Sequence, residues 1–345
     1  MMIVRPVRTT DLPVLEQMAA ASAAGVTGLT PQREYLFDRI QQSLAALESD
    51  IACQTEESYT FMLEVDGQVV GTAGLIASAG FTQPFYSYRN ETLIHASAAL
   101  GVNNKIHALT LCNDLTGVTQ LCGFYLAPEH LGSAAADVLS RARLLFIASH
   151  PQRFSERLFD EMQGYTDSEG RYPFWEAIGK PFFKMEVEEV DRRIALGNKT
   201  FIAELMPTYP IYVPLLPDAA QQAMGQIHPD AEVPFAILTD EGFEADDYID
   251  AIDGAPTLTA KTHWVRSIVH SKLARLCITD NRPAGTEPFL LSNLQTRQFR
   301  AGLADVLLHG DEAWVTLETA HALACEAGDQ VRLVRFEGCA GGGFA

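Results

Sequence analysis

The segment from Gln120 to Ala148 constrains the fold more than any other part of the chain. Gln120–Leu126 is an apolar, aromatic run of strand length that ends before Pro128, and Ser133–Ala148 is a strong helix pattern rich in Ala, Leu and Arg. Backbone N–H groups at the start of such a helix can bind a phosphate. If the strand splays from its neighbour, further N–H groups are left for a carbonyl oxygen. The segment therefore predicts an α/β fold with an anion site between strand and helix.

The elements before this segment alternate strand and helix. Ile3–Val7 is a β-rich run, and Thr10-Asp11-Leu12-Pro13 offers a helix N-cap followed by proline in the first turn. Gln32–Leu47 predicts a second helix with apolar residues four apart. Asp66-Gly67 lies between two apolar runs and predicts a β-hairpin. The chain thus opens as strand, helix, helix and hairpin.

Later stretches have weaker patterns. The aromatic and polar stretch that begins at Gly80 is interpreted as an irregular loop followed by one strand, Ile106–Cys112. Phe201–Leu205 is expected to be a strand. From about Leu276 onward, β-like runs separated by Gly and Asp predict a small β-rich module.

The charge balance excludes several partners. The 345 residues include 44 acidic and 25 basic side chains, which gives a formal net charge of −19. Nucleic-acid binding needs a basic surface, and anionic lipid would be repelled, so neither partner is expected. A small anionic ligand held by local backbone N–H groups stays compatible with this charge.

Targeting signals and metal motifs are absent from the sequence pattern. The N-terminus has no apolar core of a signal peptide, and no apolar run approaches the ~20 residues that a membrane helix needs. The six cysteines form no Cys-x-x-Cys pair and no zinc-type cluster with histidine. Reduced thiols in a cytoplasmic protein are therefore expected, with no metal.

Several long blocks, in the same order, resemble the arginine N-succinyltransferase family of GNAT-like acyltransferases. The resemblance runs from residue 1 to about residue 336 and is strongest to the alpha subunit of the two-subunit arginine/ornithine enzyme. The blocks are Ala79–Ser87, Asn90–Ser97, Leu111–Gly117, Pro173–Trp175, Phe201–Pro207, Pro210–Tyr212, Gly225–Pro229 and Tyr248–Asp250. The resemblance implies transfer of succinyl from succinyl-CoA to the α-amino group of L-arginine, at the start of arginine breakdown to glutamate. Ornithine is a second candidate acceptor, and a homologous second subunit or further copies of the chain are candidate partners.

The resemblance also implies site residues. His228, in the Gly225–Pro229 block, matches the family's proton donor. Phe124 matches the succinyl-CoA contact, and the backbone of Phe124, Tyr125 and Leu126 would supply donors for the thioester oxyanion. A histidine titrates in the range that suits protonation of a departing thiolate. The alternative is a structural histidine favoured by a helix C-terminus.

The segment that matches the phosphate-binding loop of GNAT domains departs from their sequence pattern. Their Arg/Gln-x-x-Gly-x-Gly/Ala pattern falls on Leu131–Ala136, where Leu131 takes the Arg/Gln place and Ala134 that of the glycine. A shift by two residues uses Gly132 but puts Glu129 in the Arg/Gln place. The alternative function is therefore a non-catalytic or regulatory alpha subunit that depends on a partner chain.

Other polar residues are weaker candidates. His95, His107, Asn103, Asn104, Asn113 and Asp114 either line an arginine pocket or satisfy loop backbone. Glu204 either pairs with the substrate guanidinium or is a surface charge. Asp246, Asp247, Asp250 and Asp253 form an acidic run that we interpret as a solvated face, because calcium-loop spacing is missing.

The length and the change in pattern predict three parts. We expect an N-terminal GNAT-like domain at 1–195, a second GNAT-like half at 196–270, a β-rich module at 271–338 and a flexible tail at 339–345.

Overall fold

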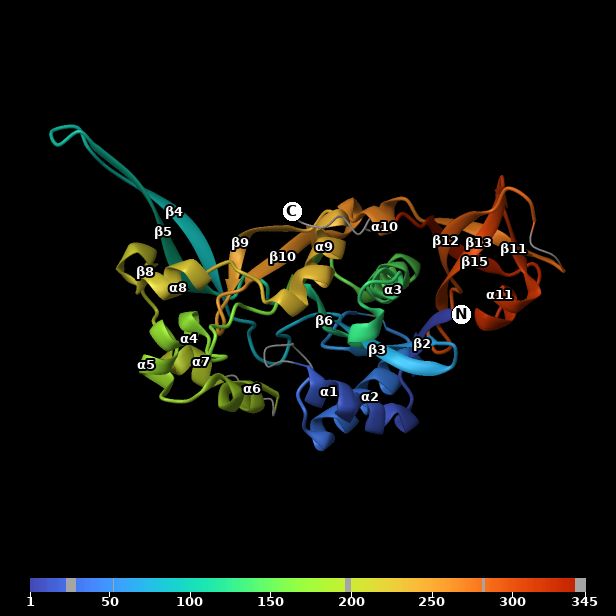
Figure 1. Cartoon of the computed structure of the whole chain (residues 1–345), viewed down its shortest axis with the longest axis horizontal. Coiled ribbons are helices and arrows are strands. Elements are labelled where there is room, and N and C mark those ends of the chain that lie inside the picture. Colours follow the sequence, from blue (N-terminus) through green and yellow to red (C-terminus); the bar gives the residue numbers. More distant parts are fainter. Residues whose placement is uncertain (23–28, 52, 196–199, 281–282, 339–345) are drawn as a thin grey trace.

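The structure is a computed structural model that describes residues 1–22, 29–51, 53–195, 200–280 and 283–338. The expected flexible tail at 339–345 lies outside the described residues. Among the described residues, fifteen strands form one continuous sheet in the order β12-β15-β11-β14-β13-β1-β2-β3-β6-β7-β10-β9-β4-β5-β8. Figure 1 shows this sheet running the length of the molecule, with helices on both sides.

The centre of the sheet is the part that Gln120–Ala148 predicts. The strands are β1 (Met2–Pro6), β2 (Ser58–Val65), β3 (Gln68–Ile76), β6 (Thr119–Leu126) and β7 (Arg157–Glu161). Helices α1 (Leu12–Ala21) and α2 (Arg33–Glu48) cover one face, and α3 (Ala135–Ser149) covers the other (Figure 1). The α/β class expected from the sequence is confirmed.

Side-chain alternation explains the two layers. Along β2, Phe61 and Leu63 pack in the core beneath α3, whereas Met62 packs against α1 and α2. Both faces of the strand are buried, as period-two alternation in a two-layer fold requires. The β2–β3 hairpin turns at Asp66 (φ 49°) and Gly67 (φ 83°), the positive angles that the Asp-Gly pair predicts.

Beyond β7 the sheet continues with strands from both halves of the chain. Its strands here are β10 (Pro256–Lys261), β9 (Glu244–Asp250), β4 (Ser87–Ser97), β5 (Val102–Cys112) and β8 (Ile211–Tyr212). The accompanying helices are α4 (Pro173–Ala177), α5 (Lys180–Phe183), α6 (Val187–Ala195), α7 (Thr200–Leu205), α8 (Asp218–Ala223), α9 (Glu232–Asp240) and α10 (Arg266–Val269). Because β10 pairs with β7, the sheet crosses from the first part of the chain to the second.

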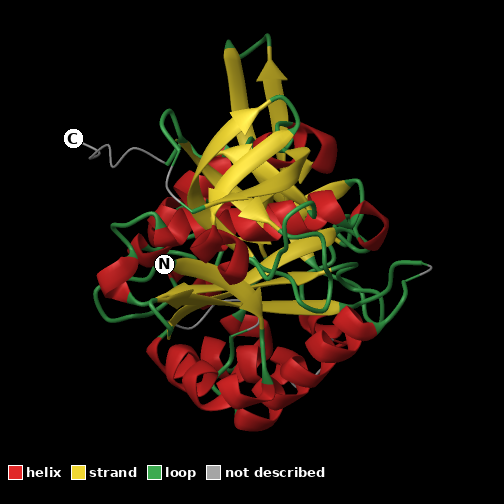
Figure 2. Cartoon of the chain, turned by 90° about the vertical axis from the view of Figure 1, so that its right-hand side faces the viewer, coloured by secondary structure: helices red, strands yellow, loops and turns green. Residues whose placement is uncertain are grey.

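The C-terminal module is a closed barrel. It consists of β11 (Lys272–Thr279), β12 (Glu287–Ser292), β13 (Ala301–His309), β14 (Glu312–Thr316) and β15 (Gln330–Arg335), with α11 (Leu317–Ala322) beside it. Pairing of β12 with both β13 and β15 closes the ring and leaves no free edge strand. The barrel joins the main sheet where β13 pairs with β1. Figure 2, which looks from this end, shows the layered sheet and helices behind it.

Two sequence expectations are wrong. Instead of a loop followed by one strand, β4 and β5 form a long hairpin that projects from the body (Figure 1). Polar residues occupy both faces of much of β4, so it shows no apolar alternation. Phe201–Leu205 lies in helix α7, because Ile202 and Met206, four residues apart, both enter the neighbouring core.

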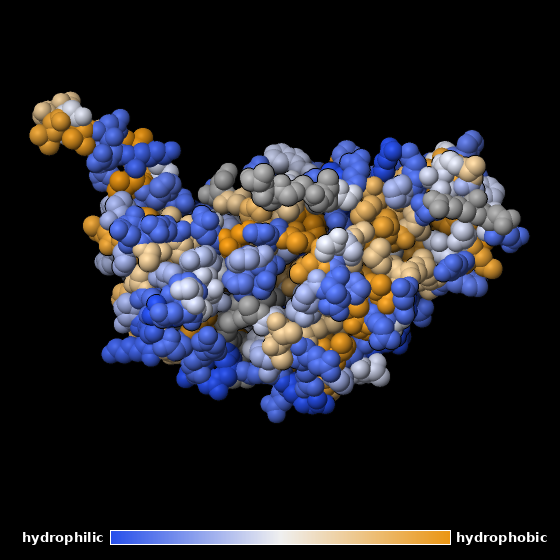
Figure 3. All heavy atoms as spheres, viewed as in Figure 1, coloured by the Kyte–Doolittle hydropathy of each residue, from blue (hydrophilic) through white to orange (hydrophobic). Residues whose placement is uncertain are grey.

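The tip of the β4–β5 hairpin carries exposed apolar side chains. Ile94 is 71% exposed and Leu100 is 78% exposed. Figure 3 shows apolar atoms gathered at the end of this arm, outside the body of the protein. A cluster of this kind favours contact with a partner surface.

Candidate active site

Strands β6 and β7 pair at one end only. They run parallel and are in register at Thr119↔Leu158 and Leu121↔Asp160. Beyond Leu121, β6 continues to pair with β3 alone, as far as Leu126. The two parallel strands therefore splay apart, and the β7-facing backbone groups at the end of β6 lie outside the ladder. This is the opening in which a thioester carbonyl could find backbone donors.

A β-bulge lies at the start of this splay. The β3–β6 register shifts between Thr72 and Gly74, opposite Gly123, which has a φ of 60°. As a result Phe124 packs in the core beneath α3, whereas Tyr125 packs against the α1 and α2 side. A bulge re-aims backbone groups beside a site, and glycine adopts this positive angle without strain.

His228 caps a short 3-10 helix, Pro229–Ala231. Its Nδ1 accepts a hydrogen bond from the backbone N–H of Asp230 at 3.2 Å, and the Asp230 carboxylate lies 3.5 Å from the same nitrogen. Among the described residues, no group bonds to Nε2, and the side chain is 21% exposed. In the neutral ring the bond to Nδ1 places the proton on Nε2, and in the protonated ring both nitrogens carry a proton, so Nε2 bears an N–H in either state.

Backbone pairing brings His228 to the splay. Its N–H donates to the carbonyl of Gln163 at 2.8 Å, and Gly164 bridges to Ile227. Gln163 comes two residues after the end of β7, beyond the last residue of that strand that pairs with β6. The segment of His228 therefore lies beyond the end of β7 that diverges from β6, the strand that carries Phe124, Tyr125 and Leu126, although the two segments are far apart in the sequence.

Asp253 anchors this arrangement, which the sequence analysis missed. Its side chain is buried and accepts hydrogen bonds from the N–H groups of Gly164 (2.7 Å) and Ala255 (2.9 Å). A Cβ on Gly164 would lie 2.6 Å from Cγ of Asp253, so only glycine fits there. The solvated-face interpretation of the acidic run is wrong at this position. The Asp253-Gly254 pair, a turn signal, is the clue in the sequence.

The start of α3 is the candidate site for the phosphate groups of an acyl-CoA. Gly132 is exposed, with open space around it, and Ser133 Oγ accepts from the N–H of Ala135 at 3.2 Å. Asp137 lies in the first helical turn and pairs with Arg141 at 2.7 Å. The helix N-terminus offers N–H donors for phosphate, while a carboxylate already shares its first turn.

Arg141 ties α3 to the second half of the chain. Its Nε donates at 2.8 Å to Glu241, which has no exposed surface. Ser267 adds donors from its N–H (2.6 Å) and its hydroxyl (2.7 Å) to the same carboxylate. A fully buried carboxylate requires such partners, so this cluster fixes α3 against α9 and α10.

A second buried charge pair lies beneath the splay. Arg143 is fully buried, with its guanidinium 3.9 Å from Asp160 and over the ring of Phe124. Burial lowers the pKa of Arg143 and raises the pKa of Asp160 to about 7, against the opposing effect of Arg143.

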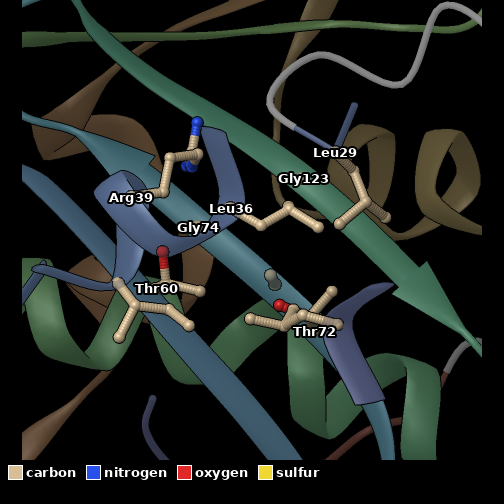
Figure 4. A pocket seen from close by; sticks show the side chains of 10 residues that line it. Leu29, Leu36, Arg39, Thr60, Thr72, Gly74 and Gly123 are labelled. Atoms are coloured by element: carbon tan, nitrogen blue, oxygen red, sulfur yellow. The ribbon is translucent and has the colours of Figure 1, made fainter. Parts of the chain in front are cut away.

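A pocket lies on the opposite face of the bulge, under α1 and α2. It is narrow, with room for about one water molecule (about 10 Å³), and is lined by Leu15, Leu29, Leu36, Arg39, Ile40, Thr60, Thr72, Ala73, Gly74 and Gly123. Figure 4 shows Arg39 at one end and Leu29 at the other, with Thr72 and Gly123 from the sheet between them. We call this cavity the Gly123 pocket.

The weaker candidates lie elsewhere. His95, Asn103 and Asn104 are exposed on the projecting hairpin, and His107 bonds to Asn90 at 2.9 Å. None of them lines the Gly123 pocket.

The remaining weaker candidates are on the surface of the second half. Asn113 is exposed, Asp114 pairs with Arg89 at 2.9 Å, and Glu204 is exposed on α7. Within the described ranges, no group of three or more His, Cys, Asp or Glu side chains could hold a metal ion. No described helix is long and apolar enough to cross a membrane.

Comparison with known proteins assigns the chain. Residues 2–267 match the family model "Arginine N-succinyltransferase beta subunit", and residues 272–335 match the model of its C-terminal domain. A Pseudomonas aeruginosa protein named arginine N-succinyltransferase subunit alpha is 46% identical and covers 97% of this chain and 99% of its own length. A Yersinia enterocolitica arginine N-succinyltransferase is 38% identical, with 97% of each chain covered.

A solved structure agrees along the same length. The arginine/ornithine succinyltransferase subunit AI from Pseudomonas aeruginosa superposes with a TM-score of 0.87 and 44% identity, and 97% of this chain and 98% of that chain are covered. The chain therefore belongs to the arginine N-succinyltransferase family, a family of acyltransferases.

Proposed function

We propose that this chain transfers the succinyl group of succinyl-CoA to the α-amino group of L-arginine, giving CoA and N2-succinyl-L-arginine. Ornithine is a second acceptor in this proposal. The observation that supports it is the splay of β6 from β7, with the bulge at Gly123 where it starts and His228 beyond the end of β7. The net charge of −19 favours encounter with a cationic amino acid.

The proposed reaction uses groups on both sides of the splay. The neutral amine attacks the thioester carbon, and a C–N bond forms while the carbonyl oxygen gains negative charge. Backbone N–H groups of Phe124 and Leu126 stabilise that oxyanion, whereas the N–H of Tyr125 faces β3 opposite Thr72. Collapse breaks the C–S bond, the imidazolium form of His228 donates its Nε2 proton to the CoA thiolate and becomes neutral, and the surplus proton of the amine returns to the ring through water.

Succinyl-CoA follows the path from α3 to the splay in this proposal. The pyrophosphate lies at the N–H groups that begin α3, near Gly132, and the thioester lies beside Phe124. No metal is required for this chemistry.

We also propose that the chain is divided into three parts, residues 1–195, 196–270 and 271–338, and that the protein is cytoplasmic.

Thiol release tests the function directly. Purified full-length chain is mixed with succinyl-CoA, and free CoA is followed with a thiol-reactive chromogen. We expect release that depends on L-arginine, slower release with ornithine and little with lysine. Absence of arginine-dependent release, with succinyl-CoA binding intact, would contradict the proposal.

A non-catalytic alpha subunit is the second candidate. The observations that favour it are the missing Arg or Gln at Leu131 and the presence of Asp137 in the first turn of α3. The exposed apolar tip at Ile94 and Leu100 gives a partner subunit a surface to cover. Release that appears only after a homologous second subunit is added would favour this candidate.

A further inference from the structure

Arg39 is a buried cation without an acidic partner. Arg39 is 9% exposed, and it lines the Gly123 pocket. The guanidinium donates to the hydroxyl of Tyr35 at 3.3 Å and to Sγ of Cys122 at 3.6 Å. No carboxylate in the described part of the chain forms an ion pair with it. Burying a guanidinium with only neutral partners is unfavourable, so the site lacks one negative charge.

Other buried arginines in the same layers are satisfied differently. Arg153 is 5% exposed and donates to the carbonyls of Ala46 (3.0 Å) and Ser49 (2.8 Å), which end helix α2. Helix C-terminal carbonyls carry partial negative charge and stabilise a cation. Arg143 has Asp160 beside it. Arg39 has neither kind of partner among the described residues, although it lines the Gly123 pocket.

The guanidinium of Arg39 lies next to the β-bulge at Gly123. Cys122, which its Nη2 contacts, directly precedes Gly123 in β6. A Cβ on Gly74 would lie 3.3 Å from the same nitrogen, so glycine leaves room for the guanidinium over β3. Cys122 and Gly123 are one strand step of ~3.3 Å apart, so the guanidinium lies beside the part of β6 where the carbonyl of a short acyl chain would bind.

We propose that Arg39, at the wall of the narrow Gly123 pocket, binds the free carboxylate of the succinyl group. The planar fork of arginine matches a carboxylate, and this ligand would supply the negative charge that the pocket lacks. The inference rests on the proposed function for the identity of the acyl group. It makes Arg39 the residue that distinguishes succinyl from a neutral acyl chain of the same length. The α-carboxylate of L-arginine is the other source of the same chemistry.

Binding and turnover test the subsite on the full-length chain. Arg39→Gln and Arg39→Lys are compared with Arg153→Gln, a matched loss of a buried guanidinium away from the pocket. Dissociation constants are measured by calorimetry for succinyl-CoA and for butyryl-CoA, which has a methyl group in place of the carboxylate. Where turnover occurs, kcat/KM is measured for both thioesters, and for L-arginine against L-argininamide.

Arg39→Gln should weaken succinyl-CoA binding roughly 10- to 100-fold and change butyryl-CoA binding little, as expected for one charge-assisted interaction. Arg39→Lys should retain part of the preference, and Arg153→Gln should keep all of it. Equal weakening of both thioesters, or binding of neither by the wild type, would overturn the subsite. A collapse of the arginine-to-argininamide preference alone would assign Arg39 to the amino acid instead.

These outcomes separate the subsite from the proposed function. If the wild type prefers succinyl-CoA, Arg39→Gln abolishes the preference, and arginine releases no thiol, the subsite stands and catalysis by this chain fails. If arginine releases thiol and Arg39→Gln keeps the full preference, catalysis stands and the subsite fails.

Discussion

Two replacements of His228 separate its structural role from proton donation. Its Nδ1 caps the 3-10 helix through the N–H of Asp230, and its Nε2 has no bonding partner among the described residues. In His228→Asn, the side-chain oxygen occupies the place of Nδ1 and can keep the cap, because asparagine is a favoured N-cap residue. In His228→Ala, both the cap and the proton donor are lost.

The two roles predict different magnitudes. Loss of the cap in His228→Ala should lower the free energy of unfolding by about 1 kcal/mol, whereas His228→Asn should leave it nearly unchanged. Loss of a general acid should lower kcat by roughly 10²-fold or more in both variants. The assay is CoA release at saturating succinyl-CoA and L-arginine, with urea unfolding of the same samples.

His107→Asn is the matched control, because that histidine lies on the hairpin and bonds only to Asn90 among the described residues. It should leave kcat within about twofold of the wild type, which is far outside the range of acid catalysis. A wild-type kcat in folded His228→Asn would refute proton donation and leave a capping role.

Three further predictions concern stability and assembly. Arg141→Met removes a partner of the fully buried carboxylate of Glu241 and should lower the free energy of unfolding, measured in urea, by about 3–5 kcal/mol. The control Arg171→Met, at a side chain that is 56% exposed, should lower it by less than ~1 kcal/mol. Similar losses in the two variants would contradict the burial argument. Because burial raises the pKa of Asp160 from 3.8 to about 7, the folded state holds a proton that the unfolded state releases, so stability should fall as pH rises from about 4 to 7. Asp160→Asn should flatten that slope in urea titrations, and an unchanged slope would assign it to other groups. If the hairpin tip is a subunit contact, Ile94→Ser with Leu100→Ser should lower the assembled mass in light scattering at unchanged thermal stability; an unchanged mass would remove the tip from any interface.

The central strand, turn and helix could be predicted from local sequence. Gln120–Leu126 and Ser133–Ala148 agree with β6 and α3 because the apolar pattern of each segment matches one regular structure. The turn at Asp66-Gly67 was equally local, because few residue pairs adopt its positive angles. Long blocks in order identified the family, since order along the whole chain is far more specific than one motif.

Other elements depended on partners distant in the chain. The strand β4 has polar side chains on both faces, so only its pairing with β5 and β9 defines it. The helix α7 is short, and a five-residue apolar run fits a strand or a helix until its core is known.

The sequence by itself determined the α/β class, the family and the residue types available for acyl transfer. Only the tertiary structure decided which of them meet. His228 reaches the splay through a hydrogen bond to Gln163, and Asp253 changes from an acidic surface residue to a buried anchor. Arg39 becomes a cation without a counter-ion only because α2 packs it onto β3 and β6. Such properties arise from desolvation and from contacts between distant segments, and no local pattern in the sequence records them.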